Sequence, residues 1–250
     1  MKLNIDRVLG RPFNVDTFVA DVEDGVVHDK FPPNPGIWRV STLVQLWDEG
    51  CEKLLYLYLK HGGEKEFDTE VVKTFHLGTS IHDIVKEYFR VSPHFQVKHE
   101  ELGIKHRTLP ITGTMDLVVE WDKYPGQEFI VEIKSSNTDY INRPIYGARY
   151  KPFKKHRWQA GLYSTIYGAP AIVLYYDKNN SEMYSHLLKK EDYEKDVNTI
   201  LSTCSRIWDE RVQELGSASY FPLPMLPGIC KNKPKASCHM KEHCDVGCKI

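Results

Sequence analysis

The stretch Phe129–Asn137, FIVEIKSSN, shows the two-residue alternation of a β-strand. Its large apolar side chains at odd positions fall on one face, which is expected to be buried. The other face holds Glu132 and Lys134, an acid and a base two residues apart. In isolation, such a pair is most simply a weak ion pair on a solvated surface. The rest of the chain decides between that interpretation and a functional one.

The composition is that of a globular protein whose charge is nearly balanced. The 250 residues are 41% hydrophobic and 27% charged, and the net charge is −1. A nucleic acid would therefore have to bind a local basic patch. The N-terminal residues lack the apolar run of a signal peptide, and no stretch of about 18 apolar residues could span a membrane. We therefore expect a cytoplasmic protein.

Helical periodicity marks four segments. Ser41 matches an N-cap for one helix that continues to Gly62, although Gly50 interrupts its pattern. A second helix is expected over about 68–90, and a third over 154–167. A fourth is expected over 191–213, with inward positions at Val197, Ile200, Leu201, Cys204, Ile207 and Trp208.

Four strands are expected, in two pairs. Residues 113–121 and 128–136 flank a turn, and residues 171–178 and 182–188 flank another. The order of elements predicts an α/β domain with a small mixed sheet flanked by helices. The predicted organisation is an irregular N-terminal arm over 1–40, a core over 41–219 and a cysteine-rich tail over 220–250.

The first strand pair brings three charged side chains together. Alternation in 113–121 places Asp116 opposite the apolar face, and therefore on the same side as Glu132 and Lys134. Carboxylate oxygens suit Mg²⁺ or Mn²⁺, and such a cation would activate water and neutralise charge on a phosphate. Lys134 could orient the water or neutralise the phosphate. The alternative is a solvated charged face.

This arrangement depends on the register of the hairpin. Asp116 and Glu132 share a face only if the connection between the last paired residues of the two strands has an odd number of residues. A three-residue loop centred on Gly126 would meet this condition, because glycine commonly supplies the left-handed position in such loops. We therefore predict an odd-length connection or a β-bulge.

Two of the expected helices supply further polar residues. Gln159 and Tyr163 are four residues apart and share a helical face, as do Gly78 and His82. Cations at the start of a helix favour phosphate, although such runs are usually solvated. The basic run before Gln159 consists of Lys151, Lys154, Lys155, His156 and Arg157.

Taken in order, these residues resemble the signature of the RecB-type branch of the PD-(D/E)XK nuclease superfamily. That signature is a helical His, an Asp in a G-x-x-D strand, E-x-K, and Q-x-x-x-Y on a helix. The resemblance covers roughly residues 38–250 and leaves the first part of the chain unexplained. The matching residues here are His82, Gly113-Thr-Met-Asp116, Glu132-Ile-Lys134 and Gln159-Ala-Gly-Leu-Tyr163.

The resemblance implies a restriction-endonuclease-like core and a role for each matching residue. The metal, Mg²⁺ or Mn²⁺, would be held by His82, Asp116, Glu132 and the backbone carbonyl of Ile133. Lys134 would be catalytic together with the two carboxylates, and Gln159 and Tyr163 would organise the site and the DNA strand. DNA is expected to bind through Lys154, Lys155 and Arg157.

The cysteines extend the resemblance to the AddB-type and CRISPR-associated nucleases, which carry a 4Fe-4S cluster. One ligand would come from an early helix and three from the tail, namely Cys51, Cys230, Cys238 and Cys244. The alternative is a zinc site made from the tail alone, using Cys248 as well, with His239 or His243 as substitutes. That alternative leaves Cys51 without a role. Cys204 lies on an apolar helical face and is expected to be a core residue.

The function expected from the resemblance is a metal-dependent deoxyribonuclease, an exonuclease on single-stranded DNA or duplex ends. It would serve recombination, repair, replication or phage DNA processing. The alternatives are a DNA-binding module with an inactive site and a CRISPR-adaptation factor that trims DNA. The sequence contains no G-x-x-x-x-G-K-[ST] loop, so any unwinding would need a separate helicase or recombination protein.

Overall fold

A six-stranded mixed sheet forms the centre of the fold. The computed structural model describes residues 35–50, 52–62, 69–143 and 147–216, with side chains described as far as Asp209. The strand order is β1-β3-β4-β5-β6, and β2 pairs with the other side of β3. The strands are β1 (Trp38–Arg39), β2 (Phe95–Lys105), β3 (Ile111–Trp121), β4 (Glu128–Ser136), β5 (Ala171–Asp177) and β6 (Met183–Leu187).

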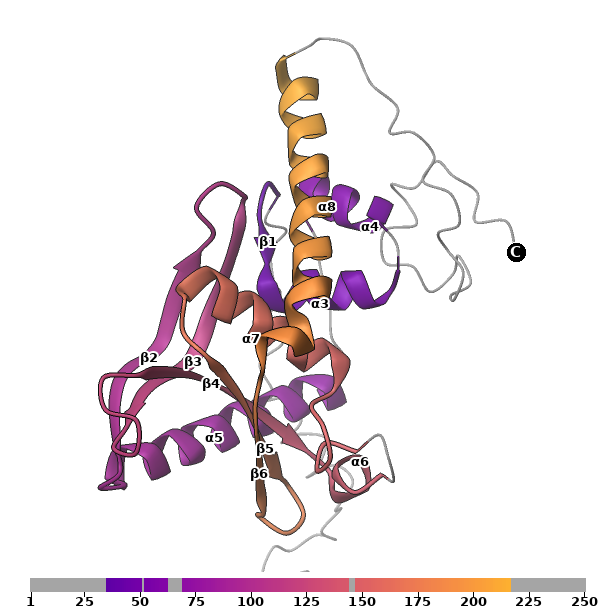
Figure 1. The fold of residues 1–250 in the computed structure, drawn as a ribbon. Coiled ribbons are helices and arrows are strands. Elements are labelled where there is room, and N and C mark those ends of the chain that lie inside the picture. Colours follow the sequence, from indigo (N-terminus) through magenta and orange to yellow (C-terminus); the bar gives the residue numbers. More distant parts are fainter. Residues whose placement is uncertain (1–34, 51, 63–68, 144–146, 217–250) are drawn as a thin grey trace, which may run out of the picture.

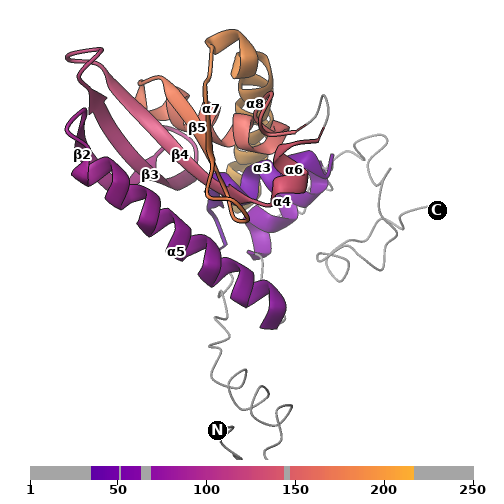
Figure 2. The same ribbon diagram turned by 90° about the horizontal axis from the view of Figure 1, so that it is seen from below.

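Helices cover both faces of this sheet. Helix α5 lies across one face, and α7 and α8 lie on the other, where α3 also packs (Figures 1 and 2). Pairing is parallel for β1 with β3 and for β4 with β5, and antiparallel elsewhere. The helices are α3 (Val40–Asp48), α4 (Glu52–His61), α5 (Thr69–Val91), α6 (Thr138–Ile141), α7 (Lys154–Tyr167) and α8 (Lys190–Gly216).

The two faces of the hairpin β3–β4 belong to two separate hydrophobic cores. Leu117, Val131 and Ile133 pack under α5, as the alternation predicts. Val118 and Ile130 point the other way, into the core that α7 and α8 cover. The face that carries Glu132 is therefore buried. The interpretation of Glu132 and Lys134 as a pair on a solvated face is wrong.

The helix expected from Ser41 to Gly62 is in fact two helices. Gly50 has a φ of 69°, a left-handed conformation that ends the regular helix between α3 and α4. Ser41 lies inside α3, whose N-cap is Arg39, so its assignment as the N-cap was also wrong. The chain turns at Gly50 between the two helices because glycine adopts this backbone conformation without steric cost.

Three elements were not predicted, of which β2 is the most consequential. Its eleven residues are mostly polar and half-exposed, and a bulge between Val97 and His99 interrupts their alternation. The two-residue β1 and the four-residue α6 are too short to produce a periodic pattern. Without β2, the hairpin β3–β4 would have been placed at the edge of the sheet.

The later helices match their predictions closely. Helix α7 spans 154–167 as expected and ends at Gly168, whose φ is 91°. Along α8, Val197, Ile200, Cys204 and Ile207 are buried in the core shared with α7. None of the described helices is both long and apolar enough to cross a membrane. The expected arm and tail fall largely in 1–34 and 217–250, outside the described residues.

Candidate active site

A gap in the sheet organises the site. Strand β2 pairs along one side of β3 over most of its length. On the other side, β1 pairs with Ile111 and Thr112, and β4 pairs with Leu117 to Glu120. Among the described residues, no strand pairs on that side with 113–116. We call the unpaired edge of β3 along these four residues, Gly113 to Asp116, the sheet gap.

The register places Asp116 and Glu132 just beyond the last pair of the β3–β4 ladder. Leu117 pairs with Val131, and continuing this register by one step matches Asp116 with Glu132. Seven residues separate the paired Glu120 and Glu128, so the predicted odd-length connection is confirmed. A loop centred on Gly126 was wrong, because the connection is longer and its centre lies earlier in the chain.

Asp116 occupies the position where β3 and β4 separate. Its Oδ2 accepts a hydrogen bond from the backbone N–H of Ile133 at 2.7 Å. This bond satisfies an N–H group that would otherwise pair with β3 if the ladder continued. Its Oδ1 lies 3.4 Å from Nδ1 of His82, on α5. Burial raises the pKa of Asp116, but the His82 hydrogen bond and the Lys134 charge outweigh it, and the pKa lies below the usual value. Asp116 is therefore a carboxylate.

Glu132 is a buried carboxyl group with one oxygen unused. Its side chain is 2% exposed, and Oε1 accepts from Lys134 Nζ at 2.6 Å and from Gln159 Nε2 at 2.7 Å. Oε2 is buried and has no hydrogen-bond partner among the described residues. Burial and the charge of Asp116 raise the pKa of Glu132 to about 8, against the opposing effect of Lys134. At neutral pH the Glu132 carboxyl group is therefore largely protonated in the metal-free protein, and a bound cation would favour its carboxylate form.

Lys134 is held as an ammonium group. Besides Glu132, its Nζ donates to Oε1 of Gln159 at 3.2 Å. Burial lowers the pKa of Lys134, but the charges of Glu132 and Asp116 more than compensate and raise it above the usual value. A lysine with a raised pKa is a hydrogen-bond donor and a positive charge. It is poorly suited to accept a proton near neutral pH.

Gln159 and Tyr163 join the site on one face of α7, as their spacing predicted. Gln159 Nε2 also lies 3.4 Å from the Tyr163 hydroxyl. The Tyr163 ring fills the sheet gap over Gly113, where an added Cβ would lie 2.7 Å from Cε1 of Tyr163 and 3.1 Å from Cγ2 of Val40. The glycine of the G-x-x-D motif therefore makes room for the tyrosine of the Q-x-x-x-Y motif.

This contact gives a prediction. Gly113→Ala should destabilise the protein by about 1–3 kcal/mol, because its methyl group overlaps a ring packed between two buried elements. The control is Gly103→Ala on β2, where an added Cβ meets no atom within 4 Å. Urea unfolding of both variants measures the difference. Equal stability of the two variants would show that the Tyr163 ring moves aside without cost.

The donor set fits a hard divalent cation. Asp116 and Glu132 offer carboxylate oxygens, and His82 offers an imidazole nitrogen beside Asp116. No three His, Cys, Asp or Glu side chains in the described part of the chain are already grouped as a metal site. The unused Oε2 of Glu132 shows that a carboxylate oxygen is available in the site. The Ile133 carbonyl stays a predicted ligand.

The predicted DNA-binding residues lie in the first turns of α7, the helix that carries Gln159. Lys154 Nζ lies 4.4 Å above the Trp158 ring, and Lys155 is exposed. Arg157 is half-buried, and its Nε has no partner within the described residues. Lys154 and Lys155 are thus available to solvent at a helix N-terminus, whereas Arg157 is accessible only in part.

Two pairs of residues near the site were missed by sequence reasoning. Lys86 is buried on α5, one turn after His82, and forms an ion pair with Glu101 of β2. Tyr175 is adjacent to Lys134 in the β4–β5 register, and its hydroxyl lies 2.9 Å from His156 Nδ1. The spacing of His82 and Lys86 was visible in the sequence, but β2 was not predicted.

The environment of His156 fixes its protonation state. The Tyr175 oxygen accepts the N–H of Phe153 at 2.9 Å, so its own hydrogen is free to be donated to Nδ1 of His156. Burial lowers the pKa of His156 to about 3, with the charges of Lys134 and Lys155 adding to the effect. The imidazole is therefore neutral in the folded protein and carries its proton on Nε2.

His156 should make stability fall in acid. A neutral buried histidine contributes stability that is complete above its unfolded pKa of about 6.5 and is lost as the pH falls toward the folded value. Because the ring is only half-buried, we expect a loss on the order of 2 kcal/mol between pH 7 and pH 4. His156→Asn keeps an acceptor near the Nδ1 position and should lack this component. Urea unfolding of both proteins at the two pH values measures it; identical pH dependence would contradict the assignment.

Comparisons with known proteins add information on the fold. No protein-family model matches the sequence, and no curated protein matches it significantly. Among solved structures, an alkaline exonuclease from Laribacter hongkongensis, LHK-Exo, matches with a TM-score of 0.52 and 15% identity. The match covers 72% of this chain and 90% of that one. The sheet flanked by helices is therefore a fold that this chain shares with the exonuclease.

Two further structures are similar. LHK-Exo in complex with dAMP matches with a TM-score of 0.51 and 15% identity, with the same coverage of 72% and 90%. The protein SSO0001 matches over 81% of this chain and 88% of its own, at 16% identity and a TM-score of 0.43. At these identities, the two LHK-Exo structures support a shared fold.

Of the six cysteines in the sequence, the structure describes Cys204, which is buried in α8 as a core residue, as predicted. Burial raises the pKa of its thiol well above the usual range. The five cysteines of the competing cluster and zinc predictions lie outside the described residues: Cys51, Cys230, Cys238, Cys244 and Cys248.

Proposed function

We propose that the protein is a divalent-metal-dependent deoxyribonuclease of the RecB-like PD-(D/E)XK type that hydrolyses phosphodiester bonds. The observation that carries this proposal is the buried Oε2 of Glu132, which has no partner in the part of the chain that the structure describes and lies in a site shared with Asp116 and Lys134. A protein rarely buries an unused carboxylate oxygen beside a second carboxylate unless a cation completes the site. The fold shared with an alkaline exonuclease supports the same conclusion.

The residues divide the chemical task among them. Asp116, Glu132 and His82, with the Ile133 carbonyl, would hold Mg²⁺ or Mn²⁺. When bound, the cation would lower the pKa of a water molecule and neutralise charge on the phosphate. Lys134 is held as an ammonium group, so its Nζ can donate a hydrogen bond to a phosphate oxygen or to the attacking water.

The α7 residues would support this arrangement by holding the side chains of the site in place. Gln159 donates to Glu132 and accepts from Lys134, so it fixes the separation of the acid and the ammonium group. Tyr163 lies beside Gln159 and packs over Gly113 in the sheet gap. Burial raises the pKa of Tyr163 well above the usual range, so its hydroxyl stays protonated.

The substrate proposed is DNA, cleaved from single-stranded or duplex ends, with a separate helicase or recombination protein supplying any unwinding. The decisive experiment digests end-labelled single-stranded and double-stranded DNA with anaerobically purified protein, with Mg²⁺, with Mn²⁺ and with EDTA. Metal-dependent release of labelled nucleotides supports the proposal. DNA binding without cleavage under all three conditions would favour a binding module with an inactive site.

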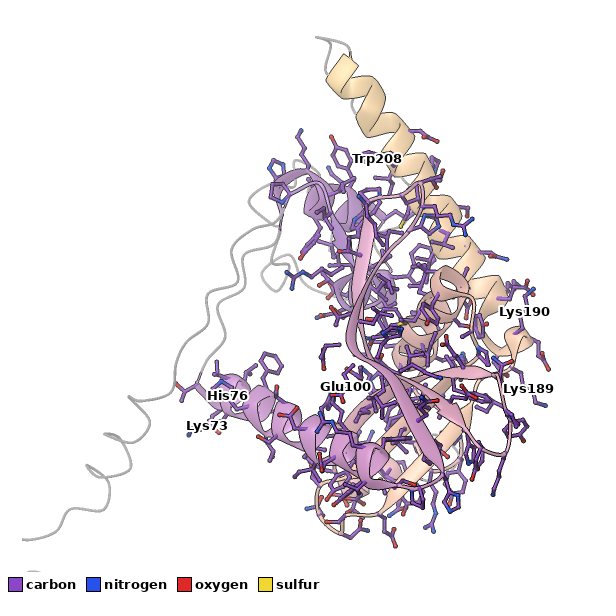
Figure 3. The ribbon with its side chains drawn as sticks, turned by 90° about the vertical axis from the view of Figure 1, so that its left-hand side faces the viewer. Lys73, His76, Glu100, Lys189, Lys190 and Trp208 are labelled. Carbon is purple, nitrogen blue, oxygen red and sulfur yellow. The ribbon has the colours of Figure 1, made fainter. Side chains whose placement is uncertain are left out.

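Binding of the strand is proposed to involve the start of α7. Each lysine that contacts a phosphate of a single strand adds about 0.7 to the slope of log affinity against log salt concentration. Replacing Lys154 and Lys155 with glutamine should therefore lower this slope by about 1.4 and weaken binding at low salt. The matched control replaces Lys189 and Lys190, at the start of α8 (Figure 3), and should leave the slope unchanged. Fluorescence anisotropy of labelled oligonucleotides measures the slope for both double variants. Equal slopes would show that the strand does not bind at the start of α7.

A 4Fe-4S cluster on Cys51, Cys230, Cys238 and Cys244 is part of the proposal. The resemblance to the cluster-bearing nucleases supports it, as does the buried core position of Cys204, which leaves five other cysteines for metal ligation. Iron and acid-labile sulfide in anaerobically purified protein, lost in Cys51→Ser, would support the cluster. Colourless protein with one zinc ion that survives Cys51→Ser would instead support a zinc site in the tail.

A further inference from the structure

The backbone of β2 is distorted directly opposite Asp116. Glu100 pairs with Leu117 and Leu102 pairs with Met115, so the register places Glu101 across from Asp116. Glu101 has a φ of 47°, in the left-handed region that non-glycine residues rarely adopt. A distortion of this kind persists only where surrounding contacts hold it in place.

A buried lysine makes that contact. Lys86 Nζ forms an ion pair with the Glu101 carboxylate, and the Lys86 side chain is only 6% exposed. Asp83 lies farther off, at 3.9 Å from the same nitrogen. A buried ammonium group is costly unless it is paired, so the pair ties α5 firmly to the distorted residue of β2.

The same helix face carries His82. Lys86 follows His82 by four residues, so the two side chains lie one turn apart on the face of α5 directed at β2 and β3. His82 contacts Asp116, and Lys86 contacts the residue opposite Asp116. The two contacts therefore fix one helix against the two neighbouring strands at a single level of the sheet.

We propose that Lys86 and Glu101 are positioning residues. Their ion pair fixes the position of α5 along the sheet, so that the His82 imidazole lies next to Asp116. The inference rests on the proposed metal-dependent site but concerns a different property of it. Loss of the pair should let α5 shift along the sheet and separate His82 from Asp116. Neither residue needs to touch the cation or the DNA.

The matched control lies one turn farther along α5. Arg90 forms an ion pair with Glu100 of β2, the neighbour of Glu101. The Arg90 side chain is 43% exposed, whereas the Lys86 side chain is 6% exposed, so the positive charge of the control pair is solvated. Arg90→Met therefore breaks an α5–β2 ion pair of similar composition without removing a buried charge.

The test uses two measurements on the full chain. Ring-nitrogen NMR resonances of His82 in the metal-free protein report its contact with Asp116, and titration calorimetry with Mn²⁺ reports metal affinity. Lys86→Met and Glu101→Gln should each shift the His82 resonances toward their positions in Asp116→Asn and weaken Mn²⁺ binding at least fivefold. Arg90→Met should change neither quantity.

The charge-swapped protein Lys86→Glu/Glu101→Lys tests whether the ion pair itself positions His82. Restored His82 resonances and Mn²⁺ affinity support the inference, since the swap rebuilds the ion pair. Unchanged His82 resonances in both single variants would overturn it, and so would single-variant losses that the swap fails to repair. Wild-type protein that binds no Mn²⁺ would contradict the proposed function, while the metal-free resonances still test the positioning role.

Discussion

Replacing Glu132 with glutamine should lower metal-dependent DNA cleavage by at least about a thousandfold, because the substitution removes the carboxylate that completes the cation site. It should not lower stability in EDTA. The amide oxygen can still accept from Lys134 and Gln159, and the neutral amide replaces a carboxyl group whose charged form burial already disfavours. Loss of activity without loss of stability would distinguish a functional carboxylate from a structural one.

Metal-linked stability gives the same substitution a second measurement. Mn²⁺ should raise the melting temperature of the wild-type protein, since a ligand that binds only the folded state stabilises it. The increase should be absent in Glu132→Gln. Glu120→Gln is the control, because Glu120 lies on the same face of the hairpin but pairs with Lys98. Full Mn²⁺-dependent cleavage by Glu132→Gln would refute the assignment of the site.

Lys134→Met should reduce the single-turnover cleavage rate by about a hundredfold to a thousandfold, while DNA affinity changes little. Lys134 lies inside the site between Glu132 and Gln159, so in the proposed function it would contact the reacting phosphate and not the length of the strand. Methionine fills a similar volume without the charge. Single-turnover digestion measures the rate, and anisotropy in EDTA measures the affinity.

The control for this variant is Lys123→Met, in the β3–β4 connection, where the lysine lies over the Trp121 ring. It removes one positive charge from the same hairpin and should leave the rate unchanged. A Lys134→Met protein that cleaves at the wild-type rate would show that Glu132 and Asp116 act without an ammonium group. A large loss of DNA affinity would instead assign Lys134 to strand binding.

The sequence was informative about this site wherever its side chains follow a regular period. The two-residue period placed Asp116 and Glu132 on one face, and the helical period placed Gln159 beside Tyr163. Both patterns arise from local backbone geometry, which each segment carries by itself. The length of the β3–β4 connection and its centre depend on side-chain contacts such as Glu120 with Gly126, which have no local pattern.

The sheet gap could not be predicted, since it depends on where separate strands begin to pair. Two residues of β1 occupy the edge of β3 next to the gap, and so short a strand has no recognisable pattern. The burial of the charged face was also missed, because alternation shows which residues share a face but not whether a helix covers it. Glu101 was missed for a third reason: its backbone conformation is set by its partners and not by its own sequence.

The parallel pairing of β1 with β3 has a consequence for the order of folding. The contact joins Trp38 to Ile111, whereas the hairpins β2–β3 and β3–β4 join segments that are close in the sequence. Contacts between distant segments form late, since closing a long loop costs entropy before any contact compensates for it. Val40 follows β1 directly and packs against the position that holds Tyr163 over Gly113. The hairpin that carries both acids should therefore form early, and the site should become complete only when the segment around Trp38 docks.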